Sequence, residues 1–563
     1  MSPKIKSKGP HWSTVHALPW LLALGLGALG VWQFHNTEFL SSFNLIPGGR
    51  GDNRFVISIL EYLYQASKGH GQFLSPAFYY PTPRTLGYSD LYLTHALLYG
   101  WLRNLGLDIF TCYQWTVLVL NVLTYLFGFW MLRWAFGFGV TASSFGAFFF
   151  AFNCPKFNQI AETQTQCLFW LALAAGLIVL FVRKTKSLKK TEAFFLLAGA
   201  GLSWDMQCLT GFYLAWFFFF WVALFLGASL LWKPTREHLI GLAKRFTRPL
   251  MGAGAVLLLG FIPFLWVYMP VLMDLGGKSY DEVQSALPQW WSFFWMGPRH
   301  AWWGWLWDSC PVIRAYVPEE GQRLGFGLVV LVSWIFLTIA AVWTLRPKGG
   351  KSLLTGYAAL AVLSTTLLAL LGLDYGGFSP WHWVFKLVPG GQSIRVVGRL
   401  VILNALPISI VLAFVLNKVF EKATAEKNLS RKLLLGAGAL LFVWVAVKEQ
   451  VSLPPYAAFE KNQELARLEY LSEKLPSTAK VFYVTAAPSL PLIPPFSATS
   501  LQIDAMLLSA VRGIPTLNGY SGHSPKDNWG LFKVRSPKYE EYVKDWINRH
   551  PLPGQAYRLE IDR

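Results

Sequence analysis

Blocks of apolar residues alternate with polar linkers along the whole chain. Most blocks are roughly 18 to 23 residues long, enough to cross a hydrocarbon layer about 30 Å thick as a helix. The blocks lie at 17–35, 115–136, 140–153, 166–182, 192–208, 211–232, 250–271, 325–345, 352–372, 399–417 and 433–448. We therefore expect an all-α polytopic membrane protein of about eleven transmembrane helices.

The basic residues predict how these helices are oriented. If the blocks cross the membrane alternately, Lys and Arg gather on one side, in the following linkers: 1–14, 183–190, 233–248, 346–351 and 418–432. Cytoplasmic linkers carry such an excess. We expect a multi-pass protein of the bacterial inner membrane, with a cytoplasmic N-terminus and a C-terminal extension outside. The short block 140–153 and the tight 208–211 turn leave the count open by one or two.

Composition supports the membrane assignment and excludes other classes. Only 14% of residues are charged, whereas soluble chains carry nearer a quarter. The net charge of +19 does not indicate nucleic acid, because its basic residues lie in linkers between apolar blocks. No GxxxxGK[ST] element is present, so ATP-driven transport is not expected. The GxGxxG match at 25–30 lies inside the first apolar block and not between a strand and a helix, so nicotinamide chemistry is not expected either.

Two modules are expected, a transmembrane module at 1–448 and a periplasmic extension at 449–563. The extension is too small for a large catalytic domain and predicts a small α/β unit. The outside loops are unequal, with long ones at 36–114 and 272–324. The second is rich in Trp, which anchors loops at the headgroup level or, alternatively, stacks on an acceptor sugar.

The first outside loop predicts two helices lying in the interface plane, at 55–66 and 91–107, because both stretches are too short or too polar to span. Asp52 precedes the first helix and Asp90 the second. A carboxylate held near the membrane surface is partly desolvated, so Asp52 is a candidate general base and Asp90 a substrate-binding residue. Alternatively, each caps its helix, or Asp52 pairs with Arg54, itself a candidate substrate-binding residue.

Arg395 and Arg399 precede the block at 399–417 and lie one helical turn apart if the segment is helical. Two guanidinium groups on the outside run against the positive-inside bias and could grip a phosphate. The alternatives are snorkelling side chains or salt bridges to loop carboxylates. His382 is expected either to assist the phosphate or to belong to the aromatic belt.

The polar segment 153–166 lies between two apolar blocks. Glu162 and Gln166 are four residues apart, so on a helix they would share a face near Asp52 and could bind sugar hydroxyls. The alternative is a solvated turn.

The arrangement of one transmembrane helix, an outside loop with an acidic residue and two interface helices, and then a many-helix bundle resembles the GT-C glycosyltransferases. The chain is also similar to a group of large bacterial membrane proteins placed with them, through Gly51-Asp52, Tyr80-Pro81-Thr82 and Arg395-x-x-x-Arg399. Asp504-Ala505-Met506 and the segment 518–522, Asn-Gly-Tyr-Ser-Gly, share this look. The resemblance implies that Asp52 is the catalytic base.

The leading hypothesis is an inverting glycosyltransferase, hexosyl or pentosyl, that moves a sugar from a polyprenyl-phosphate carrier to a glycan, lipid or protein acceptor at the outer membrane face. The alternatives are a flippase-like transporter of lipid-linked saccharides and a non-enzymatic membrane assembly protein. No DxD-type acidic pair is present, so we expect no metal and no other cofactor, with a divalent ion as the alternative.

Overall fold

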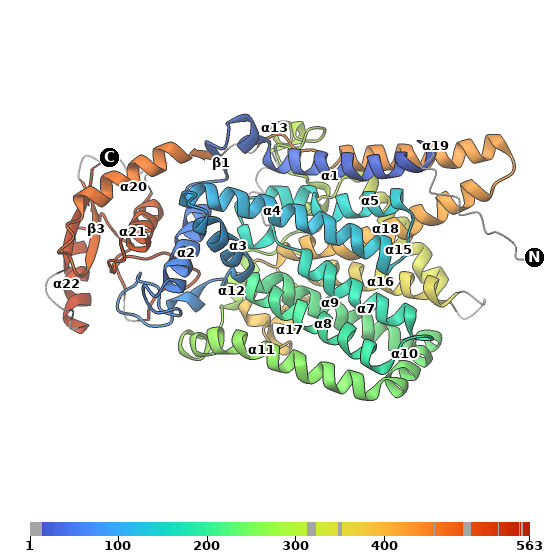
Figure 1. Ribbon diagram of the computed structural model, residues 1–563, viewed down its shortest axis with the longest axis horizontal. Helices are drawn as coiled ribbons and strands as arrows, with labels where there is room; N and C mark the ends of the chain where they lie inside the picture. The colour runs from blue at the N-terminus through green and yellow to red at the C-terminus, as the bar shows by residue number, and fades with distance from the viewer. Residues whose placement is uncertain are drawn as a thin grey trace, which may run out of the picture.

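Each of the eleven apolar blocks contains a helix in the computed structural model of the chain. The structure describes residues 14–311, 322–346, 352–454, 457–487, 497–526 and 529–550, residue 552 and residues 556–562. The helices of the blocks are α1 (Thr14–Leu40), α4 (Ile109–Trp130), α5 (Val140–Ala151), α7 (Phe169–Lys184), α8 (Lys190–Thr210), α9 (Phe212–Leu231), α11 (Thr247–Leu275), α15 (Leu328–Thr344), α16 (Leu353–Leu371), α18 (Leu400–Ala425) and α19 (Leu429–Lys448). Figure 1 shows them running along the long axis of the molecule.

Eight of these helices, within the described residues, are long and apolar enough to cross a membrane. The other three are α5, with 12 residues, α15, with 17, and α8, whose ends carry charged and polar residues. At a rise of about 1.5 Å per residue, α5 reaches roughly 18 Å and stops inside the bundle. The helical membrane fold is confirmed, and the count of about eleven spans is not.

The two ends of the bundle carry different segments. The start of α1, the linker between α7 and α8, and the basic helix α10 (Lys233–Arg245) lie at one end. The first outside loop and the C-terminal extension lie at the other end, on the left of Figure 1. This separation is what the alternating threading requires, although residues 1–13 and 347–351 lie outside the described part of the chain. Which end faces the periplasm stays a prediction.

Two helices form in the first outside loop, close to the predicted stretches. They are α2 (Asp52–Ser67) and α3 (Leu93–Asn104), joined through the short turn η1 (Thr85–Tyr88). Figure 1 shows α2 crossing the end of the bundle rather than running along it. Its residues Asn53 to Leu63 are all buried, because the C-terminal extension covers the side of α2 that faces away from the bundle.

The remaining short elements lie in the linkers and outside loops. They are η2 (Met131–Ala135), α6 (Cys154–Asn158), η3 (Thr163–Thr165), α12 (Tyr280–Ser285), η4 (Trp290–Phe294), α13 (Trp305–Ser309), α17 (Trp381–Leu387), η6 (Gly391–Ser393) and η7 (Val397–Arg399). In the Trp-rich loop, whose residues 312–321 lie outside the description, Trp295 is buried while Trp290 and Trp305 are exposed. Its anchoring role stays a prediction.

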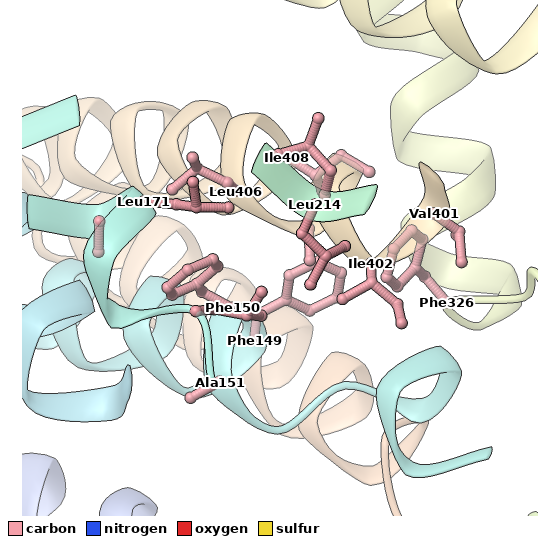
Figure 2. Packing of buried hydrophobic residues seen from close by; sticks show 14 of the residues in the cluster. Phe149, Phe150, Ala151, Leu171, Leu214, Phe326, Val401, Ile402, Leu406 and Ile408 are labelled. Carbon is pink, nitrogen blue, oxygen red and sulfur yellow. The ribbon is translucent and has the colours of Figure 1, made fainter. Parts of the chain in front are cut away.

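The centre of the bundle is filled by aromatic and aliphatic side chains around α5. Phe149, Phe150 and Ala151 are fully buried and belong to one hydrophobic cluster with Val401 and Ile402 of α18 (Figure 2). Inside a bilayer such close packing, rather than exclusion of water, holds helices together. The short helix α5 is therefore fixed on all sides.

The C-terminal extension is a small α/β unit in its described parts. It contains β2 (Ala458–Glu460), α20 (Lys461–Lys474), β3 (Phe482–Ala486), α21 (Ala498–Arg512), α22 (Tyr539–Arg549) and β4 (Tyr557–Ile561). Strand β3 pairs in parallel with β4. Strand β2 pairs antiparallel with β1 (Leu45–Pro47) of the first outside loop, so the extension is joined to the membrane module by a backbone ladder.

A buried group of charges also joins the extension to α2. Arg54 of α2 is 1% exposed and contacts Glu464 of α20, with 2.9 Å between Nε and Oε2, and Asp504 of α21. Arg467 Nη2 lies 2.6 Å from the second oxygen of Asp504, and Arg50 Nε lies 2.6 Å from Glu464. Burial alone would raise the pKa of Asp504, but Arg54 and Arg467 outweigh it and hold the pKa below its usual value.

Removing one charge from this group should detach the extension. In Asp504→Asn, Arg54 keeps only Glu464, and Arg467 loses the carboxylate oxygen it contacts. Breaking a buried ion pair by removing one partner typically costs about 3–5 kcal/mol. We expect α20 to α22 to become accessible to trypsin at a lower urea concentration, measured on the purified protein in detergent. The control is Asp545→Asn, which breaks the exposed Arg549–Asp545 pair and should cost less than about 1 kcal/mol. Equal urea midpoints for the two variants would contradict this assignment.

Candidate functional site

The first residue of α2 is Asp52, one of the acidic residues singled out in the sequence. Gly51 occupies the N-cap position, and no side chain caps this helix. Asp52 lies in the first turn, where the helix dipole favours a negative charge. It does not cap the helix, and no hydrogen bond or ion pair with Arg54 is recorded among the described residues. Its Oδ1 instead accepts a hydrogen bond of 3.2 Å from the hydroxyl of Tyr520, in the C-terminal extension.

Several charged groups act on Asp52 from other elements. Burial raises the pKa of its carboxyl above the usual value, and the charge of Glu162 adds to the rise. The hydrogen bond from Tyr520 and the positive charges of Arg399 and Arg395 act in the opposite direction. Tyr520 contacts this carboxylate directly, and the charges of Glu162, Arg399 and Arg395 act on it from segments far apart in the sequence.

Glu162 lies in a polar segment that follows the early end of α5. Its carboxylate forms an ion pair with Arg399, and both side chains are mostly buried, at 21% and 13% exposure. The expected helical face shared by Glu162 and Gln166 is wrong, because the chain there forms a 3₁₀ turn, η3, instead of an α-helix. The alternative of a solvated turn is wrong too, since Thr163 and Gln166 are fully buried.

The position of Asp90 corrects another expectation. Helix α3 starts after Tyr92 with no side-chain cap, so Asp90 does not cap its own helix. Its Oδ1 accepts a 2.9 Å hydrogen bond from the backbone N–H of Phe212, the first residue of α9. Burial raises the pKa of Asp90 to about 6, although Phe212 and Arg399 oppose the rise. Asp90 thus accepts a hydrogen bond from a free backbone N–H at the start of α9. The charge of Arg399 acts on both Asp90 and Asp52.

The two arginines differ in environment. They do not lie one turn apart on a helix as expected, because α18 begins at Leu400, the 3₁₀ turn η7 precedes it, and the backbone at Arg395 is not helical. The Arg395 side chain is exposed, and its backbone N–H donates to the Tyr213 hydroxyl at 2.9 Å. The Arg399 guanidinium is held against Glu162 and over the Tyr213 ring. Only Arg395 is placed to meet a ligand directly.

Three further candidates lie apart from this cluster or are otherwise engaged. Arg54 is buried in the ion-pair group with the extension. The Gln166 side chain folds back onto the carbonyl of Gln159 at 3.1 Å. His382 packs edge-on against Tyr280, with ring centroids 4.5 Å apart, which favours the aromatic-belt alternative over phosphate contact.

Sequence reasoning missed two residues of the site. Tyr520 lies 468 positions from Asp52, so no local spacing could pair them, although its Asn-Gly-Tyr-Ser-Gly segment was singled out. Lys278 follows α11. Burial lowers the pKa of its ammonium group, the charge of Glu282 opposes this, and the charge of Arg395 adds to the lowering. Its backbone N–H donates to the carbonyl of Gln392 at 2.9 Å, which brings the segment after α11 to the arginines.

The arrangement offers a base and a set of cations at one end of the bundle. The candidate base is the carboxylate of Asp52, and the cations are Arg395, Arg399 and Lys278. Among the described residues, no three His, Cys, Asp or Glu side chains converge as a metal site would require, and the expectation of a metal-free site stays a prediction. Such a group suits removal of a proton beside a negatively charged leaving group.

Solved structures of known proteins resemble this fold. The oligosaccharyltransferase of Archaeoglobus fulgidus, solved with a tethered acceptor peptide containing the NVT sequon, aligns with a TM-score of 0.50 and 13% identity over 95% of this chain and 68% of that one. ArnT from Cupriavidus metallidurans is a weaker likeness: bound to undecaprenyl phosphate, it gives a TM-score of 0.41 and 11% identity, over 89% of each chain. Its apo state gives 0.44 and 14%, over 89% and 90%.

No protein-family model and no curated protein sequence matches the chain. The fold assignment rests on the oligosaccharyltransferase, which like ArnT is a GT-C glycosyltransferase. The predicted resemblance to the GT-C superfamily is therefore confirmed at the level of the fold.

Proposed function

We propose that the chain is a glycosyltransferase that moves a sugar from a polyprenyl-phosphate carrier to an acceptor hydroxyl at the outer face of the membrane, with inversion at the anomeric carbon. The observation that carries the proposal is the carboxylate of Asp52, partly buried and surrounded by groups from the first loop, the segment after α5, the start of α18 and the C-terminal extension. The GT-C fold supports the same kind of reaction.

Asp52 acts as the general base. The acceptor hydroxyl attacks the anomeric carbon and its proton passes to Asp52 as the new C–O bond forms. A partly buried carboxylate with a raised pKa holds that proton better than an exposed one. Attack from the face opposite the leaving phosphate inverts the configuration.

The cations stabilise the leaving group. As the bond between the anomeric carbon and the phosphate oxygen breaks, its electron pair goes to the polyprenyl phosphate, and negative charge builds there. Arg395 and Lys278 would meet this charge, since the first is exposed and the second lies close to it. Arg399, which is paired with Glu162, would add positive potential at the leaving phosphate without contacting it. Exposed apolar side chains on the long helices suit the polyprenyl tail.

Neutralising Asp52 should abolish most transfer. We expect Asp52→Asn to lower kcat by roughly 10²- to 10⁴-fold, the usual contribution of a general base, without loss of donor-lipid binding. The assay is sugar transfer in membranes supplied with polyprenyl-phosphate sugar. Asp281→Asn, which changes an exposed carboxylate at the start of α12, is the control and should keep full activity. Full transfer activity in Asp52→Asn would contradict the role of Asp52 as the base. Absence of sugar transfer by the wild type would instead favour a transporter, because moving a lipid needs no base.

Removing the exposed cation should weaken donor binding. A hydrogen bond to a charged group contributes about 1.5–3 kcal/mol, so Arg395→Gln should raise the KM for the donor lipid at least about tenfold. Lys386→Gln, at an exposed position on α17, controls for loss of positive charge at the same end of the bundle. An unchanged KM in Arg395→Gln would show that the phosphate binds elsewhere.

A further inference from the structure

We propose that Tyr520 of the C-terminal extension is a positioning residue for Asp52: its hydroxyl holds one carboxylate oxygen, so that the other faces the acceptor. The inference rests on the proposed function in one respect, that Asp52 is the base. If Tyr520 orients the Asp52 carboxylate, the C-terminal extension takes part in the reaction itself, in addition to covering the site or binding a partner.

The contact is specific in geometry. Tyr520 donates to Asp52 Oδ1 at 3.2 Å, and its ring meets Phe55, one turn further along α2, edge-on at 5.6 Å and 90°. The hydroxyl and the ring thus both engage the first turns of α2. A phenylalanine at this position keeps the ring contact and loses only the hydrogen bond.

The segment that carries Tyr520 is held from both sides. The backbone N–H of Gly519 donates to Gln502 Oε1 at 3.1 Å, and Gln502 also accepts from Asn518 Nδ2 at 2.9 Å. The backbone of Gly519 packs closely against the Tyr79 ring: a Cβ added at this position would lie 2.6 Å from a ring carbon. The backbone N–H of Tyr520 points to the sulfur of Met506, 3.2 Å away. The tyrosine therefore has little freedom to leave Asp52.

The same segment continues to the cations. Lys278 Nζ donates to the carbonyl of Gly522 at 2.8 Å, and Lys526 Nζ lies 3.1 Å from Asp274 Oδ1 at the end of α11. Residues 518–526 thus form a strap from the first loop to the segment after α11. One strap holds both Asp52 and Lys278, the proposed base and a proposed phosphate ligand.

The hydrogen bond has a chemical consequence that can be measured. Bonding to the charged form of a carboxyl favours that form, so Tyr520 opposes the effect of burial on the pKa of Asp52. Tyr520 stays protonated and acts only as a donor, because burial and the charge of Asp52 raise its own pKa. The other ionisable groups that act on Asp52 or feel its charge are Glu162, Arg395, Arg399, Tyr92 and Tyr113.

The test is Tyr520→Phe in the full chain, reconstituted in lipid nanodiscs. Infrared difference spectra give the pKa of Asp52 from the carboxyl band that is missing in Asp52→Asn, and this readout needs no turnover. We expect that pKa to rise in Tyr520→Phe, the acidic limb of kcat/KM to move to higher pH with it, and kcat to fall about tenfold. The KM for the donor lipid should stay unchanged.

The control is Tyr557→Phe, which removes an exposed hydroxyl in β4 and should alter neither readout. If the pKa of Asp52 is unchanged in Tyr520→Phe, Tyr520 is not a positioning residue. The proposed function still stands in that case, provided that the wild type transfers sugar.

If the wild type transfers no sugar, the proposed function is wrong. A raised pKa of Asp52 in Tyr520→Phe would then show only a structural hydrogen bond, and the positioning role would be overturned as well.

Discussion

The arrangement of this end of the molecule depends on the buried ion pairs between α2 and the C-terminal extension. Arg54 gives up its hydration to lie between Glu464 and Asp504, and such desolvation costs several kcal/mol for each ion unless the charges are well paired. The pairing therefore allows one register of α21 on α2. Asp52 begins the same helix two residues earlier, and Tyr520 follows α21, so the register that satisfies Arg54 also brings Tyr520 to Asp52.

A second constraint is the early end of α5. A helix that stops inside a bundle exposes its last carbonyl groups, which no water can reach. Asn153 donates to the carbonyls of Phe149 and Phe150 at 3.2 Å each, and the buried Lys156 donates to that of Ala151 at 2.9 Å. The polar segment that begins with these caps continues to Glu162 and sets it against Arg399. The break in the helix therefore supplies one wall of the site.

Features that depend on local pattern could be predicted from the sequence. All eleven apolar blocks contain helices, and α2 and α3 form within a few residues of the expected bounds, because periodicity and turn residues act over short distances. Asp52, Glu162, Arg395 and Arg399 were found from residue type and place in the loops. The exact partners were not: Arg54 pairs with carboxylates more than 400 residues away, and Asp90 caps a helix other than its own. Such contacts depend on how helices pack, which spacing along the chain does not encode.

In the proposed function, the first loop, the start of α18 and the C-terminal extension form one site for a phosphate-linked sugar. The most direct measurement is an electron cryo-microscopy structure with a non-cleavable polyprenyl-phosphonate sugar. We expect the phosphonate to lie against Arg395 and Lys278, with the anomeric carbon facing Asp52. A headgroup found instead at the opposite end of the bundle, for example in the cavity of about 340 Å³ lined by Trp20, Arg133 and Asn417, would contradict it.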